Sequence, residues 1–181
     1  AQVKSAVLLC ALSAGVGVTV KEPLLSRDHT ERLLTAMGAE FVYPAELSGH
    51  SVKLMKREKE LAAIDITVPG DISTAAPWII AATLHDDAEL VLQGVGINPT
   101  RTGILDIMKM MGANITIVSE KNVGGEPVAD LLVKSSSLRG VTVEGELIPR
   151  SIDELTLVAL AGSRASGQTL IRDAAELSKK E

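Results

Sequence analysis

The stretch LLTAMGAEFVY at residues 33–43 recurs later in the chain as IMKMMGANITI at residues 107–117, and Gly38 and Gly112 stand at the same place in the two copies. Each copy has apolar residues at helical spacing, then a glycine that suits a helix C-terminus, then alternating apolar residues typical of a strand. The chain therefore contains a repeated helix–strand unit, and this repetition decides the fold class.

Working outward from this pair, a second apolar segment recurs three times, as AVLLCAL at 6–12, APWIIAA at 76–82 and LTLVALA at 155–161. A short strand pattern follows each of the three, at 17–20, 89–92 and 168–171. We expect a unit that runs apolar helix, strand, capped helix, strand, with the third copy stopping after its first strand.

The helix and strand patterns indicate which elements lie inside. The strand patterns alternate between apolar and polar residues, as in ITIV at 115–118, VTVE at 141–144 and IDITV at 64–68. Such strands have one dry and one wet face, whereas the three apolar helices are nearly uniform around their circumference. The sequence thus predicts an inside-out α/β fold, in which helices form the core and sheets form the outer wall.

Capping residues predict where the helices begin. The expected N-terminal caps are Asp28 with Glu31, Asn98 before Pro99, Ser151 with Glu154, and either Asp71 or Ser73. Gly38 and Gly112 are expected to end two of these helices. VPGD at 68–71 interrupts both periodicities and predicts a boundary, and NVGGEP at 122–127 predicts a hairpin turn.

Composition excludes several functions. The chain has 181 residues, 46% of them hydrophobic, and 18 Lys and Arg against 23 Asp and Glu, a formal net charge of −5. A nucleic-acid-binding surface would need a basic stripe or stacking aromatics, and only Phe41, Tyr43 and Trp78 are aromatic. No run reaches the length of a membrane span, and no His/Cys cluster has metal-ligand spacing. We therefore expect no nucleic-acid, membrane or metal partner.

Cys10 is the only cysteine, so no disulfide forms within the chain, and a cytoplasmic location is the natural expectation. We expect Cys10 to be a small buried helix residue. The chain starts at Ala1 inside an apolar helical pattern and stops at SKKE without a closing signal, which indicates a piece of a longer protein.

Four segments carry residues suited to chemistry. Ser26 and Arg27 precede one helix and Arg101 precedes its repeat, where free backbone N–H groups favour anions, although helix capping explains these residue types equally well. Asp153 follows Arg150 at the start of another helix, and the cap pattern does not need it. Lys180 and Glu181 alone indicate only a solvated charge run.

Together these segments resemble the 3-phosphoshikimate 1-carboxyvinyltransferase (EPSP synthase) family. The matching motifs, in order, are AQVKSAVLLCAL at 1–12, EPLLSRDHTERLL at 22–34, VPGDISTAAPWI at 68–79, INPTRTGILDIMKMMGA at 97–113, GELIPRSIDELTLVAL at 145–160 and IRDAAELSKKE at 171–181. The resemblance covers essentially the whole chain.

The resemblance implies an inside-out α/β barrel fold of two domains, each built from βαβαββ repeats with buried helices and outer sheets. Residues 1–69 would form the C-terminal part of the first lobe. Residues 70–181 would form the first part of the second lobe, with one repeat at 70–150 and the start of the next at 151–181.

The resemblance also implies an activity: transfer of the enolpyruvyl group of phosphoenolpyruvate to the 5-hydroxyl of shikimate 3-phosphate, with release of phosphate and with no cofactor or metal. Gln2 would lie along the shikimate ring, and Ser26 and Arg27 near its 3-phosphate. Asp153 would be the base for the 5-hydroxyl. Lys180 would lie near the reacting centre, and Glu181 would exchange a proton with the methylene carbon.

The chain also departs from the family pattern. Leu177 is followed by Ser178 and Lys179 where the family commonly has Leu-Arg-Val-Lys-Glu, and the Lys and Arg residues that clamp phosphoenolpyruvate have no counterpart among these 181 residues. We therefore expect the isolated chain to be inactive. We also expect it to self-associate, because uncovered apolar faces and unpaired strand edges favour association.

Two alternatives stay open. One is an enzyme like the UDP-N-acetylglucosamine enolpyruvyl transferases, which share the fold but use a loop cysteine, whereas Cys10 lies in a helical pattern. The other is a non-catalytic, repeat-built binding module.

Overall fold

A computed structural model describes residues 1–44 and 50–179 of the chain, which divide into two units. Unit 1 comprises Ala1–Thr67 with Val123–Glu126, and unit 2 comprises Val68–Asn122 with Pro127–Glu181. The division after Thr67 falls at the segment VPGD, where Pro69 and Gly70 interrupt the periodic patterns.

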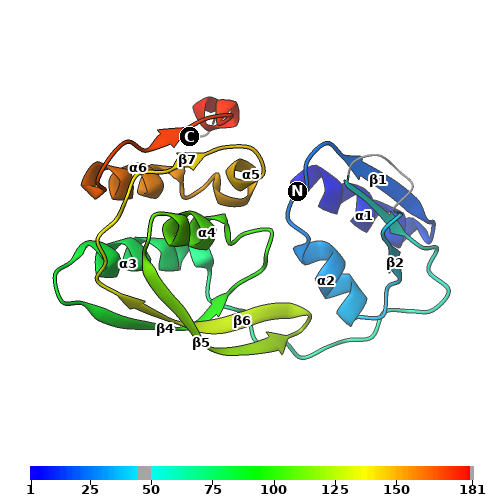
Figure 1. The fold of residues 1–181 in the computed structure, drawn as a ribbon. Helices are drawn as coiled ribbons and strands as arrows, with labels where there is room; N and C mark the ends of the chain where they lie inside the picture. The colour runs from blue at the N-terminus through cyan, green and yellow to red at the C-terminus, as the bar shows by residue number, and fades with distance from the viewer. Residues whose placement is uncertain (45–49, 180–181) are drawn as a thin grey trace. The chain divides into compact units, whose positions relative to one another are not determined.

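Unit 1 packs two helices against a three-stranded antiparallel sheet (Figure 1). Its elements in chain order are α1 (Gln2–Ala14), β1 (Val18–Glu22), α2 (His29–Ala36), β2 (Phe41–Val42) and β3 (His50–Leu54), and the strand order is β1-β3-β2. The core joins Leu8 and Leu12 of α1, Leu34 of α2 and Leu54 of β3. The inner face of the sheet is therefore dry, as the alternation of VTV at 18–20 predicts.

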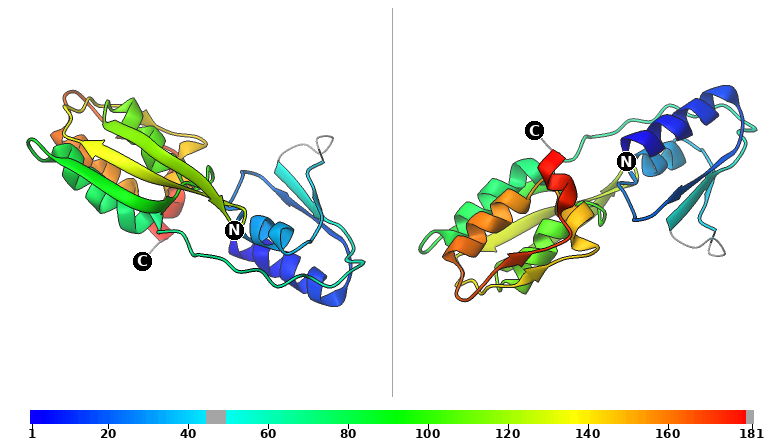
Figure 2. Two further views of the ribbon diagram at one scale, coloured as in Figure 1. Left: turned by 90° about the horizontal axis from the view of Figure 1, so that it is seen from below. Right: turned by 90° about the horizontal axis from the view of Figure 1, so that it is seen from above.

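Unit 2 places helices α3 and α4 against one face of a second sheet, and α5 and α6 lie on the far side of these helices (Figures 1 and 2). Its elements are α3 (Ile72–Leu84), β4 (Glu89–Gly96), α4 (Gly103–Met110), β5 (Asn114–Val123), β6 (Glu126–Lys134), β7 (Thr142–Val143), α5 (Leu147–Ser151), α6 (Leu155–Arg164), β8 (Leu170–Ile171) and the 3-10 helix η1 (Ala175–Lys179).

The core of unit 2 lies on the helices, as the sequence predicts. Ile79 of α3, Ile107 of α4 and Val158 of α6 have no exposed surface and belong to one apolar cluster with Leu131 of β6. The sheet order is β4-β6-β5, and Val91 on its outer face is 49% exposed. Sheets with one wet face therefore cover a helical core, although IDITV at 64–68 forms no strand.

Glycine conformations confirm three of the expected turns. Gly38 and Gly112, which follow α2 and α4, have φ values of +100° and +93°, in the left-handed region where a side chain would be strained. Gly124 and Gly125 both have positive φ and connect β5 to β6, which suits the primed type of hairpin turn.

The predicted N-cap positions are confirmed for α3 (Asp71) and α2 (Asp28) and are wrong for the other two helices. Asp71 caps α3, because its carboxylate accepts hydrogen bonds from the backbone N–H groups of Ser73 and Thr74. Helix α4 begins at Gly103 rather than near Pro99, since Asn98 instead accepts from the N–H of Thr100 in a preceding turn.

In the two remaining helices the predicted capping side chains bind elsewhere. Asp28 stands at the N-cap position of α2, but its side chain makes no capping hydrogen bond and pairs with Arg32. Ser151 donates to the carbonyl of Leu147, and Glu154 accepts from Ser73.

Cys10 is exposed, which corrects the expectation that it is buried. It lies on the same face of α1 as Val3 and Val7, at spacings of a helical stripe, and these two side chains are 79% and 39% exposed. The core of unit 1 uses the opposite face, through Leu8 and Leu12. In the part of the chain that the structure describes, no helix is long and apolar enough to cross a membrane.

Candidate functional site

Asp153 lies in unit 2, in the short segment between α5 and α6, with its side chain 25% exposed. The guanidinium of Arg101 donates from Nη1 to Oδ2 of Asp153 at 2.7 Å. An ion pair of this kind favours the charged form of a carboxylate. The geometry therefore suits Asp153 to act as a proton acceptor that solvent or a ligand can reach.

Arg101 is shared between Asp153 and the start of helix α3. Its Nη2 donates to the hydroxyl of Ser73 at 2.6 Å and lies 3.8 Å from carboxylate oxygens of both Asp71 and Glu154. Ser73 in turn donates to Oε1 of Glu154. We call Arg101, Asp153, Ser73, Glu154 and Asp71 the Arg101 cluster.

Glu154 is the most deeply buried member of the Arg101 cluster. Its side chain is 1% exposed, and among the described residues its Oε2 has no hydrogen-bond partner. Burying a carboxylate is costly unless charges or hydrogen bonds compensate, so Glu154 depends on Ser73 and on the nearby Arg101. The sequence indicated Glu154 only as a capping residue.

In unit 1, the predicted substrate residues lie around the N-terminus of α1 and the segment before α2. Gln2 is exposed at the first position of α1. Ser26 donates its hydroxyl hydrogen to Oε2 of Glu22, and Arg27 is half-buried in the same segment. Lys180 and Glu181 lie outside the described residues.

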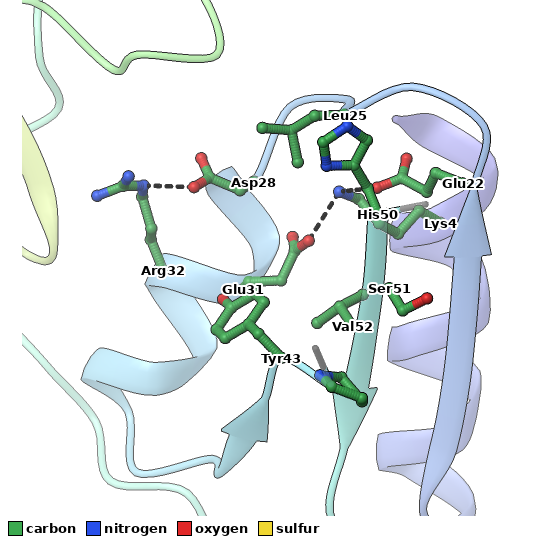
Figure 3. A pocket seen from close by; sticks show the side chains of 11 residues that line it. Lys4, Glu22, Leu25, Asp28, Glu31, Arg32, Tyr43, His50, Ser51 and Val52 are labelled. Atoms are coloured by element: carbon green, nitrogen blue, oxygen red, sulfur yellow. Dashed lines mark hydrogen bonds and ion pairs between the residues drawn. The ribbon is translucent and has the colours of Figure 1, made fainter. Parts of the chain in front are cut away.

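A pocket of about 530 Å³ in unit 1 is lined by Glu22, the residue that accepts the Ser26 hydroxyl, and holds a buried charge cluster (Figure 3). Lys4 is 4% exposed, and its ammonium lies 2.8 Å from Oε1 of both Glu22 and Glu31. Burial acts to lower the pKa of Lys4, but the hydrogen bonds and charges of the two carboxylates outweigh it and raise the pKa above its ordinary value.

The carboxylates around the pocket do not favour an anion inside it. Burial acts to raise the pKa of Glu22, but hydrogen bonds from Lys4 and Ser26 prevail and hold that pKa below its ordinary value, so Glu22 stays charged. Asp28 and Glu31 also line the pocket, against the cations Lys4 and Arg32. Negative groups outnumber positive ones, and Lys4 is already neutralised by its partners.

Sequence reasoning found Asp153 but did not assign Arg101 or Ser73 a role in the site. One signal was available for Arg101, because it stands the same number of residues before Gly112 as Arg27 stands before Gly38. Ser73 carried no such signal, since its partners Arg101 and Glu154 are distant in sequence. Among residues 1–44 and 50–179, no group of His, Cys, Asp or Glu side chains could hold a metal ion.

Comparisons with known proteins agree across the whole chain. The family model for EPSP synthase (3-phosphoshikimate 1-carboxyvinyltransferase) matches residues 1–181. The chain is 51% identical to the 3-phosphoshikimate 1-carboxyvinyltransferase of Geotalea uraniireducens and 48% identical to that of Synechococcus sp. strain RCC307. All 181 residues align with each, and they span 41% of either relative.

Solved structures give the same result for the fold. An EPSP synthase from Acinetobacter baumannii superposes on the chain with a TM-score of 0.87 at 42% sequence identity, over 99% of this chain and 40% of that one. A second structure of the enzyme from the same organism gives a TM-score of 0.88, over 100% of this chain and 40% of the other. Because the family model matches all 181 residues and the fold has the same inside-out architecture, the chain belongs to the EPSP synthase family.

Proposed function

We propose that the protein carrying this chain transfers the enolpyruvyl group of phosphoenolpyruvate to the 5-hydroxyl of shikimate 3-phosphate and releases inorganic phosphate. The single observation that carries the proposal is the match of all 181 residues to the family model, because a match this long includes every segment on which the site residues lie. Residues 1–69 would then belong to one lobe of the enzyme and residues 70–181 to the other. A cytoplasmic location suits such a biosynthetic enzyme.

The proposed mechanism divides proton transfer between two carboxylates. Asp153 accepts the proton of the 5-hydroxyl while that oxygen bonds to C2 of phosphoenolpyruvate, and Glu181 protonates the methylene carbon to give a tetrahedral adduct. The phosphate then leaves and takes up the proton held by Asp153, and return of a methyl proton to Glu181 regenerates the enolpyruvyl double bond. Lys180 lies beside the reacting centre, and Gln2, Ser26 and Arg27 bind shikimate 3-phosphate.

The ion pair with Arg101 supports the role of Asp153, because a general base must be ionised before it accepts a proton. The pocket lined by Glu22, Asp28 and Glu31 is less suitable for the substrate phosphate, since these carboxylates would repel it. The proposed phosphate ligands in unit 1 are therefore Arg27 and Ser26, whose hydroxyl would turn from Glu22 to the phosphate, and not Lys4.

A phosphate-release assay with both substrates tests the proposal, on this chain and on a longer protein in which it is extended to the length of its relatives. We expect turnover only in the longer protein, because the chain spans 41% of its relatives and the resemblance implies that the Lys and Arg clamps for phosphoenolpyruvate have no counterpart in it. In the longer protein, Asp153→Asn should lower kcat by about 10²- to 10⁴-fold, the usual contribution of a general base. Asp86→Asn, which removes an exposed carboxylate in a loop of the same unit, is the matched control and should leave kcat unchanged.

The two alternatives predict different results. Turnover of UDP-N-acetylglucosamine in place of shikimate 3-phosphate would assign the other enolpyruvyl transfer. A folded longer protein that consumes neither acceptor would indicate a binding module. Activity of the 181-residue chain by itself would show that the clamps outside it are dispensable.

A further inference from the structure

Arg101 is held so that its guanidinium meets Asp153 from a fixed direction. The loop that carries it is buried: Asn98, Thr100 and Thr102 are 2%, 5% and 9% exposed. Asn98 fixes the loop through both its side chain, which accepts from Thr100, and its carbonyl, which accepts from the N–H of Arg101 at 2.8 Å. A buried loop with its polar groups satisfied gives the Arg101 side chain a rigid base.

A second residue fixes the other end of the guanidinium. Ser73 donates its single hydroxyl hydrogen to Glu154, so its oxygen faces Arg101 as an acceptor and receives Nη2 at 2.6 Å. Nη1 is left to donate to Asp153 at 2.7 Å. Because the guanidinium is planar, acceptors on both terminal nitrogens define its orientation, and the side chain is only 11% exposed.

We propose that Arg101 is a positioning residue for Asp153: it orients the carboxylate that accepts the 5-hydroxyl proton. This inference rests on the proposed function, in which Asp153 is the base. Arg101 also lies 3.8 Å from carboxylate oxygens of Asp71 at the start of α3 and of Glu154, the neighbour of Asp153. Its shortest carboxylate contact of the three is the one to Asp153, at 2.7 Å, so the guanidinium holds that carboxylate in a defined direction.

The repeat suggests a competing role, which the contacts do not favour. Arg27 occupies the equivalent repeat position in unit 1 and is proposed to bind the substrate phosphate. Arg101 directs one N–H of each terminal nitrogen to a protein acceptor, and only 11% of its side chain is exposed, so little of the guanidinium is accessible to a phosphate. Its role therefore differs from that of its repeat counterpart.

The test uses the longer, active protein with the variants Arg101→Gln and Arg101→Lys. We expect Arg101→Gln to lower kcat by about 10- to 100-fold while both KM values stay within about 3-fold, because only an interaction with the reacting base is lost. Arg101→Lys keeps the charge without the two-pronged geometry and should recover part of kcat. If Arg101→Gln does not fold, the comparison of Arg101→Lys with the wild type tests the positioning role instead. We then expect kcat to fall while KM stays unchanged.

A double-mutant cycle isolates the link to Asp153. If Arg101 acts through Asp153, adding Arg101→Gln to Asp153→Asn should cost less than about 3-fold in kcat. Arg150→Gln is the matched structural control, since Arg150 also bridges this loop, to Pro99 and Asp106, without touching Asp153. It should lower the melting temperature but not kcat.

Three results would overturn the inference. A rise in KM at constant kcat would make Arg101 a substrate ligand, and an undiminished loss in the Asp153→Asn background would make its effect independent of the base. An equal fall in kcat for Arg150→Gln would show that loosening the loop is sufficient. A wild-type protein without turnover would instead remove the proposed function itself, and this inference with it.

Discussion

Lys4 is the residue on which the charge balance of unit 1 depends. Its side chain is 3% exposed and its partner Glu31 is 2% exposed, with the ammonium 2.8 Å from the carboxylate. Within the described part of the chain, the second oxygen of Glu31 has no hydrogen-bond partner. Removing Lys4 would therefore leave a buried carboxylate without compensation, which is the costly case for a buried ion pair.

Lys4→Met keeps the length of the side chain and removes its charge. We expect it to lower the free energy of unfolding of unit 1 by about 3–5 kcal/mol at neutral pH, the usual cost of breaking a buried pair. Hydrogen exchange of the amides paired between β1 and β3, such as Val20, measures this locally. Lys53→Met, at an exposed position of β3, is the control and should stay within about 0.5 kcal/mol.

The difference between Lys4→Met and the wild type should shrink in acid. The pKa of Glu22 is lowered from 4.5 in the folded wild type, so the stabilising contribution of Glu22 is present above pH 4.5 and is lost as the pH falls through the lowered value. Lys4→Met lacks the hydrogen bond from Lys4 that lowers this pKa, so Glu22 contributes less stability in the variant and acid removes less of it. A difference that stays constant down to pH 3 would mean that Glu22 is not part of the effect.

At the scale of elements, Asp71 shows when a capping pattern can be trusted. Its carboxylate accepts from the N–H groups of Ser73 and Thr74 at 3.1 and 3.2 Å, and it remains 58% exposed, so no deeper partner competes for it. Asp71→Ala should destabilise α3 by about 1 kcal/mol, whereas Asp71→Asn, an equally good cap, should cost only a few tenths. Trp78 is the only tryptophan and lies on α3, so urea unfolding followed by its fluorescence reports on this helix.

Equal losses in Asp71→Ala and Asp71→Asn would contradict the capping interpretation. That result would assign the stability to the charge of Asp71, which lies 3.8 Å from Arg101, rather than to its hydrogen bonds.

Periodicity predicted the helices and turns well, but caps were predictable only where no tertiary partner intervenes. Glu31 and Glu154 both fit capping patterns, yet each is recruited into a buried contact, with Lys4 and with Ser73. Local rules compare a side chain with its own helix terminus and take no account of a residue that folding brings near. The same limitation explains why Asp153 was recognised through the family motif while its pairing with Arg101 was not foreseen.

At the scale of the whole molecule, the three apolar helices form much of the core as predicted, but they are not enclosed on every side. The sequence predicted helices enclosed on every side, and in this chain each of the three keeps an exposed apolar residue: Val3 on α1, Trp78 on α3 and Leu160 on α6, at 79%, 60% and 51% exposure. Relatives are more than twice as long, since the chain spans 41% of them. The 181 residues supply too few neighbours to cover these faces, so the sequence predicted the apolar character of the helices but not their complete burial.

The exposed apolar faces predict that the 181-residue chain self-associates, because apolar patches on a soluble surface gain free energy when another copy covers them. Sedimentation velocity over a range of concentrations should show that the share of dimers or larger species grows with concentration.

Val3→Glu in unit 1 and Trp78→Glu in unit 2 should each shift the distribution toward monomer, since a buried carboxylate opposes association at these faces. Gln93→Glu adds the same charge at an exposed position of β4 and should leave the distribution unchanged. A monodisperse monomer at high concentration would show that these faces are too small to drive association, and equal effects of all three variants would assign it to net charge instead.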